Sequence, residues 1–101
     1  MSYWFFKIET GQSTPNDWQV YSPTGVMVDV NTSAAGFTAT PRYITALHGV
    51  GSHWATTGGS SVYVPTPNGF RIYVKWSDNS PLVPATAQGN GWYIQWIGIQ
   101  S

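Results

Sequence analysis

The run WYIQWIGI at residues 92–99 constrains the fold more than any other part of this chain, because apolar side chains occupy both its odd and its even positions. In an extended strand these positions face opposite sides, so neither side suits contact with water. Such a strand lies at the centre of a sandwich, or a second copy of the chain covers one of its faces. We assign Trp92, Ile94 and Trp96 to the core. We expect the opposite face, which carries Gln95, to meet a partner, since interfaces tolerate a polar group better than cores do.

The rest of the chain consists of short strand-like segments separated by turn residues, and it has no helical period longer than a turn. The expected strands span residues 3–10, 26–30, 42–50, 61–65, 70–76 and 92–99, and residues 82–88 could hold a single helical turn. The first strand is expected to stop at Gly11. A length of 101 residues fits a single domain over residues 1–101 with one core. We therefore expect an all-β fold, a single antiparallel β-sandwich of six to eight short strands.

The surface of this protein is expected to be neutral and rich in hydrogen-bonding groups. Charged residues make up only 8% of the chain, against about a quarter in ordinary globular domains. Four basic and four acidic residues cancel. Nucleic acid and anionic membranes both require clusters of Lys and Arg, so neither is an expected partner.

The compartment stays open at this stage. No stretch approaches 18 apolar residues, and the first residues lack the positive charge before an apolar segment that a secretory signal shows, so we expect a soluble chain. The chain has no cysteine, which is natural for a cytosolic protein or for a virion part assembled in the cytosol. An extracellular or virion-surface location remains an alternative.

Catalytic and metal chemistry have few candidate residues. Ser60 or Ser77 could in principle act with His53 and Asp78, because a catalytic triad is defined in space, but no nucleophile-elbow pattern is present. His48 and His53 have no acidic neighbour close in sequence that would complete a metal site. We expect no enzyme activity, no cofactor and no metal.

Aromatic residues beside polar turns are better candidates for a binding site. Aromatic residues make up 16% of the chain, and an aromatic ring offers a flat apolar face to a sugar while neighbouring Asn, Asp and Ser bond its hydroxyls. Trp54 follows His53 in a glycine-flanked loop, and Trp76 is expected where its strand meets a polar turn. Edge packing of the two indoles is the alternative. The candidate ligand-binding residues are Trp76, Ser77, Asp78, Asn79, His53 and Trp54.

The order of landmarks along nearly the whole chain resembles the H-type lectin domain, the family of the snail agglutinins. The motif KIETG at residues 7–11, followed by Trp18, is similar to the opening of that domain. The segments FTATP at residues 37–41 and PNGF at residues 67–70 resemble its central part, and WIGI at residues 96–99 is similar to its closing strand.

This resemblance implies a six-stranded antiparallel sandwich that forms trimers and binds galactose-type sugars, typically N-acetylgalactosamine, between protomers. Trp76 falls near the family's sugar-binding tryptophan. Two family contacts have no match, because Ser77 stands where a histidine follows that tryptophan, and Thr56 or Thr57 stands near the sugar-binding arginine. We therefore expect a multivalent glycan-binding module. The alternative is a trimerising structural or receptor-binding module, such as the tip of a phage tail fibre, without sugar binding.

Overall fold

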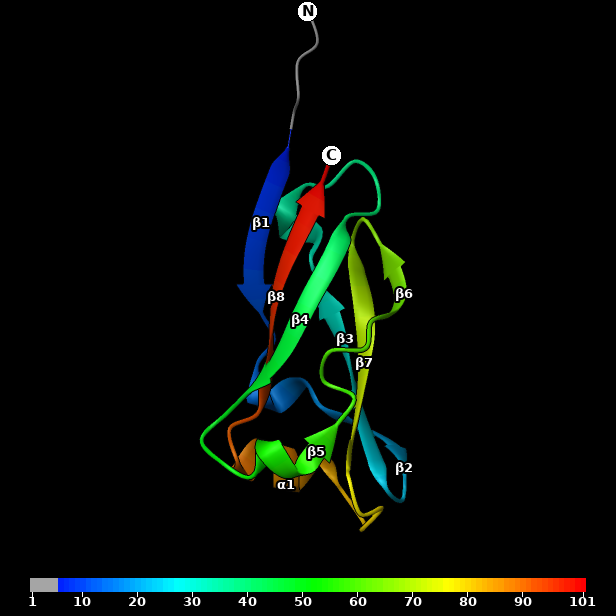
Figure 1. Cartoon of the computed structure of the whole chain (residues 1–101), viewed down its shortest axis with the longest axis vertical. Coiled ribbons are helices and arrows are strands. Elements are labelled where there is room, and N and C mark those ends of the chain that lie inside the picture. Colours follow the sequence, from blue (N-terminus) through cyan, green and yellow to red (C-terminus); the bar gives the residue numbers. More distant parts are fainter. Residues whose placement is uncertain (1–5) are drawn as a thin grey trace, which may run out of the picture.

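The computed structural model describes residues 6–101 and shows two antiparallel sheets packed as a sandwich (Figure 1). The expected all-β class is confirmed. The described part of the chain contains eight strands, within the expected range of six to eight.

The smaller sheet has three strands in the order β1 (Lys7–Gln12), β8 (Tyr93–Gln100) and β4 (Arg42–His48). The strand β8 is therefore central, with both edges paired. Its inward side chains, Ile94 and Trp96, are buried, whereas Gln95 and Ile97 on the other face are only partly covered. The expected division of this strand into a core face and an outer face is confirmed.

The larger sheet has five strands, all antiparallel to their neighbours. Its order is β2 (Gln19–Ser22), β3 (Gly25–Asn31), β7 (Gly69–Trp76) and β5 (Thr56–Thr57), and β6 (Tyr63–Thr66) also pairs with β7. The longest strand, β7, alternates buried and partly exposed residues because one face meets the core.

The core lies between the two sheets and is made of aliphatic and aromatic side chains from their inner faces. Its described members are Trp18, Val26, Val28, Val30, Phe37, Phe70, Ile72, Val74, Leu82, Ala87, Trp92, Ile94 and Trp96. The ring centroid of Trp96 lies 6.0 Å from that of Tyr43 and 6.5 Å from that of Phe70, so aromatic contacts join the sheets. The packing role expected for Trp92 and Trp96 is confirmed.

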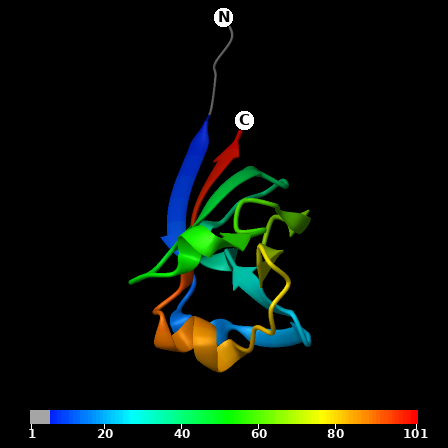
Figure 2. The same ribbon diagram turned by 60° about the horizontal axis from the view of Figure 1, so that its bottom comes forward.

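Short helices close one end of the sandwich, away from the end where β1 begins and β8 finishes (Figures 1 and 2). The helix α1 (Pro84–Gly89) lies beside the 3₁₀ turn η1 (Pro15–Asp17). The backbone N–H of Trp92 donates to the carbonyl of Ala87 at 3.0 Å, which links α1 to β8. Two further 3₁₀ turns are η2 (Ser33–Ala35) and η3 (His53–Ala55).

The expected bounds of the first strand are wrong at their C-terminal end. Residues 3–5 of that prediction lie outside the described residues, and β1 runs through Gly11 to Gln12. Gly11 pairs with Trp96, and a Cβ atom at position 11 would lie 2.7 Å from the indole carbon Cζ2. This glycine therefore makes room for a core tryptophan inside a strand.

Two strands were not expected from the sequence. Along β2 most side chains are exposed, and its register with β3 shifts, so no clear alternation marks it. The strand β5 has two residues in a stretch that was expected to be a loop, and it exists because Thr56 and Thr57 reach the edge of β7.

We predict that Gly11→Ala destabilises the protein by about 1–3 kcal/mol, because the new methyl group overlaps the buried Trp96 indole. The matched control is Gly51→Ala, since a Cβ atom at position 51 meets nothing within 4 Å. Both substitutions lower the conformational entropy of the unfolded chain by a similar amount. The difference between their free energies of unfolding therefore reports the steric clash with Trp96. Urea denaturation monitored by tryptophan fluorescence measures it, and equal midpoints for the two variants would contradict the prediction.

Candidate functional site

Two segments that are far apart in the sequence meet at the closed end of the larger sheet. Thr56, which directly follows η3, pairs with Trp76 at the end of β7. The backbone N–H of Ser77 donates to the carbonyl of Ala55 at 2.9 Å. The structure thus places the loop that carries His53 and Trp54 beside the turn that follows Trp76. We call residues 53–54 and 76–79 the loop site.

The two tryptophans of the loop site differ in what they offer to a ligand. Trp54 is 89% exposed. Trp76 is half-buried and packs edge-on against Trp92, with 5.3 Å between ring centroids and an interplanar angle of 76°. Trp54 therefore presents a free aromatic surface, whereas part of Trp76 belongs to the core.

Trp92 also supports the loop that leads to Trp54. Its indole Nε1–H donates to the carbonyl of Gly51 at 2.8 Å, and the N–H of Val50 donates to the carbonyl of Asn90 at 2.9 Å. The segment before η3 is therefore tied to the start of β8 at two points.

Internal hydrogen bonds order the polar turn of the loop site. Asp78 Oδ1 accepts from the backbone N–H of Ser80 at 2.9 Å and from its hydroxyl at 2.6 Å. These bonds stabilise the carboxylate and lower the pKa of Asp78 from its ordinary value. Asn79 has a positive φ of 64°, and its Oδ1 accepts from Lys75 Nζ at 2.8 Å. Asp78 is thus an ionised acceptor at neutral pH.

His53 is half-buried. Its Nδ1 is enclosed and lacks a hydrogen-bond partner in residues 6–101. Within the same range no hydrogen bond joins His53 to Ser60, Ser77 or Asp78, and the bonds of the Asp78 side chain go to Ser80. The described residues also contain no group of three potential metal ligands.

A second surface feature is the outer face of the three-stranded sheet. Ile8, Ile44, Ile97 and Ile99 share this face, and Thr10, Ile97 and Ile44 lie side by side across β1, β8 and β4. Ile8 is 57% exposed and Ile44 is 59% exposed. We call these four residues the isoleucine face. It is the face on which Gln95 lies.

Sequence alone did not single out three other residues that the structure gathers, namely Tyr21, Tyr63 and Tyr73. They come from β2, β6 and β7 and meet on the outer face of the larger sheet. The only signal was the outward position of Tyr73 in the alternation of β7. Strand order and register decide which side chains join it, and neither can be read from the sequence.

Comparison of the sequence with models of known protein families and with curated proteins finds no match. Among the described residues no helix has the length and apolar character needed to cross a membrane.

We predict that the carboxyl group of Asp78 titrates below the ordinary aspartate pKa of about 3.9, and that Ser80→Ala moves its midpoint upward. The Ser80 hydroxyl is the largest cause of the lowered pKa. Because the folded-state pKa is lowered, this group favours the folded state above the ordinary pKa. That contribution is lost as the pH falls through the folded value.

Carbon-13 NMR titration of the Asp78 carboxyl between pH 2 and 6 tests this. Thr24→Ala, which leaves the turn intact, is the control. A midpoint that does not move in Ser80→Ala would show that the hydroxyl bond does not form in solution.

Proposed function

We propose that this protein is a non-enzymatic carbohydrate-binding module that acts as a homo-oligomer, with a trimer as the expected assembly. The observation that supports it most is the position of Trp54, an almost fully exposed indole beside the ordered polar turn of Asp78 and Asn79. Galactose-type sugars, including N-acetylgalactosamine, are the first candidates because of the resemblance to H-type lectins.

The chemistry of the loop site fits a glycan. An indole face provides apolar contact for the C–H groups of a sugar ring, and its rigidity keeps the entropy cost of binding low. The Asp78 carboxylate accepts hydrogen bonds from sugar hydroxyls, and the Asn79 amide can donate and accept. Trp76, which packs against Trp92, sets the position of the turn.

The isoleucine face supports self-association. Four isoleucines on one flat sheet surface form an exposed apolar area of the kind that marks contact sites. Polar Thr10, Gln12 and Gln95 and charged Arg42, which pairs with Ile99, lie around it, as is common at the rim of an interface. An assembly of three copies that meets a glycan-coated surface gains avidity of about 10²–10⁴ over one site if all three engage together.

The competing proposal is a structural or receptor-binding module that uses the isoleucine face to trimerise and binds no sugar. The isoleucine face supports this structural proposal as well as it supports a glycan-binding oligomer. The exposed indole of Trp54 favours the glycan proposal, because assembly through the other sheet gives this side chain no role.

We predict that Trp54→Ala weakens glycan binding by about 30-fold, equivalent to about 2 kcal/mol, as expected for a central aromatic contact. Because Trp54 is exposed, its loss should change the free energy of unfolding by no more than about 0.5 kcal/mol. A glycan array followed by calorimetry with the best ligand provides the measurement. The control is Val50→Ala, which removes another exposed apolar side chain from the same loop. A blank array for the wild-type protein at high concentration would favour the structural proposal.

We predict that Ile44→Glu converts the oligomer to a monomer, because the substitution places a second charge within an apolar contact. Multi-angle light scattering after size exclusion should show the mass falling from three chains to one of 11.1 kDa. Val50→Glu adds the same charge at a side chain that is 91% exposed and away from the sheet, and should leave the mass unchanged. A wild-type monomer would refute the assembly through this face.

A further inference from the structure

The outer face of the five-stranded sheet carries a cleft that adjoins the loop site, since Lys75 Nζ donates to Asn79 Oδ1, and that lies on the opposite sheet from the isoleucine face. Its volume is about 370 Å³, within the range of small-molecule sites, about 300–1,000 Å³. The residues that matter for its chemistry are Tyr21, Tyr63, Tyr73, Thr57, Ser61 and Lys75. We call these six residues the tyrosine cleft.

Three tyrosine rings converge in the cleft. The ring of Tyr73 lies 4.5 Å from that of Tyr21 and 5.0 Å from that of Tyr63, measured between centroids. Tyr73 is half-buried, whereas Tyr21 is 60% exposed and Tyr63 is 50% exposed. The two outer rings therefore leave much of their surface to solvent around a more rigid central ring.

Tyr21 and Tyr73 meet across the strand that separates them. The strand β3 lies between β2 and β7, so a side chain from β2 must cross β3 to reach β7. Gly25 of β3 lines the cleft beside Tyr21, and a Cβ atom there would be 3.7 Å from Tyr21 Cδ2, an ordinary van der Waals distance.

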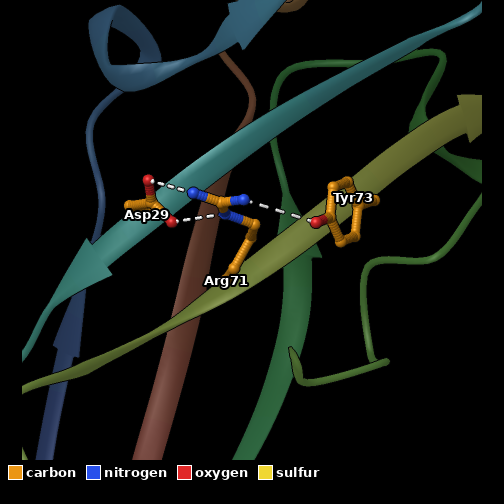
Figure 3. A network of polar contacts seen from close by, with 3 residues as sticks. All are labelled: Asp29, Arg71 and Tyr73. Carbon is orange, nitrogen blue, oxygen red and sulfur yellow. Dashed lines mark hydrogen bonds and ion pairs between the residues drawn. The ribbon is translucent and has the colours of Figure 1, made fainter. Parts of the chain in front are cut away.

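A charged pair fixes the position of the Tyr73 hydroxyl (Figure 3). Arg71 donates from Nε and Nη2 to the two carboxylate oxygens of Asp29, at 2.6 and 2.9 Å, and from Nη1 to the Tyr73 hydroxyl at 3.4 Å. The hydrogen bond from Arg71 lowers the pKa of Asp29, so the pair stays charged at neutral pH. The central ring is thus held by an interaction outside the cleft.

Tyr63 is placed by an unusual backbone. Val64, the next residue, has a φ of +50°, a conformation that is rare and strained for a β-branched side chain. The register between β6 and β7 shifts between Tyr63 and Thr66, so the strand bulges here. The backbone is therefore strained at Val64, directly after Tyr63, where the bulge sets the position of Tyr63 at the cleft.

The polar groups of the cleft are neutral hydroxyls and one cation. The side-chain hydroxyls of Thr57 and Ser61 make no hydrogen bond to the described part of the chain, so both can bond a ligand. Lys75 is the one charged residue among those that line the cleft. Its Nζ donates to the neutral Asn79 Oδ1, and no ion pair with it occurs within residues 6–101.

We propose that the tyrosine cleft binds a hexopyranose that carries a carboxylate, such as a uronic acid unit of an acidic polysaccharide. The sugar ring lies against the exposed tyrosine surface, its hydroxyls bond Thr57 and Ser61, and its carboxylate pairs with Lys75. A single lysine on a chain of zero net charge suits one carboxylate, whereas a phosphate chain needs a cluster of cations. No residue at positions 53–54 or 76–79 is a ligand contact in this proposal, and the two sites share only the hydrogen bond from Lys75 Nζ to Asn79 Oδ1.

The test is a titration of the full-length, isotope-labelled protein with sodium methyl β-D-glucuronide and, as the matched neutral sugar, methyl β-D-glucoside. Two-dimensional NMR follows the ring signals of the tyrosines and the amides of Thr57 and Ser61. We expect these signals to shift with both sugars, with an apparent Kd at least about fivefold lower for the glucuronide at low salt. Added sodium chloride should remove most of that difference, because it screens the contact with Lys75.

Single substitutions test which side chain makes each contact with the sugar. Tyr63→Ala should weaken both sugars at least tenfold, and Tyr63→Phe should retain most of the binding because the ring remains. Lys75→Gln should abolish the preference for the glucuronide and keep the binding of the glucoside. Trp54→Ala should leave these titrations unchanged, which separates this site from the loop site.

Two results would overturn the proposal. One is the absence of shifts at the tyrosines with either sugar at 50 mM, a wild-type result that does not depend on any variant folding. The other is equal affinity for both sugars at low salt, which would remove Lys75 and the carboxylate from the site.

Discussion

Two tryptophans, Trp96 on the inward face of β8 and Trp92 directly before that strand, support most of this structure. Trp96 joins the sheets, because its indole packs near Tyr43 of β4 and Phe70 of β7 while Gly11 of β1 leaves space for it. Trp92 supports the closed end, where its carbonyl accepts from the indole N–H of Trp18 at 2.8 Å. Removing either side chain would open a large cavity in the core between the sheets, which is small in a chain of only 101 residues.

Three regions of the surface differ in their side chains and in their exposure. In the loop site, Trp76 packs against Trp92 of the core, whereas Trp54 is exposed to solvent. The isoleucine face and the tyrosine cleft lie on the outer faces of opposite sheets, so an assembly through the first leaves the second open to ligands. Two distinct sugar contacts on one protomer would let a small, weakly charged protein recognise a mixed glycan surface through several weak interactions.

Alternation of apolar and polar residues was sufficient to predict the strands β3 and β7, because each has one plainly apolar face that lies in the core. The strand β8 was predicted instead from a run that is apolar at both its odd and its even positions. Alternation did not predict β2, whose side chains are mostly exposed, or β5, which has too few residues to show a pattern. The prediction that the first strand stops at Gly11 was wrong, because the sequence does not distinguish a glycine that ends a strand from one that makes room for a neighbouring indole. For the loop site, the pairing of aromatic and polar residues drew attention to two segments that the structure brings together. Their proximity and the unequal exposure of Trp54 and Trp76 depend on the pairing of β5 with β7.

By itself the sequence determined the all-β class, the neutral surface and the assignment of Trp92, Ile94 and Trp96 to the core, because composition and side-chain period act locally along the chain. Only the tertiary structure decided which strands are neighbours. That order brings Tyr21 over Gly25 to Tyr73, places Ile44 beside Ile97, and sets η3 against the end of β7. The physical reason is that antiparallel registers are selected by the packing of whole faces, a collective property that no single segment of the sequence contains.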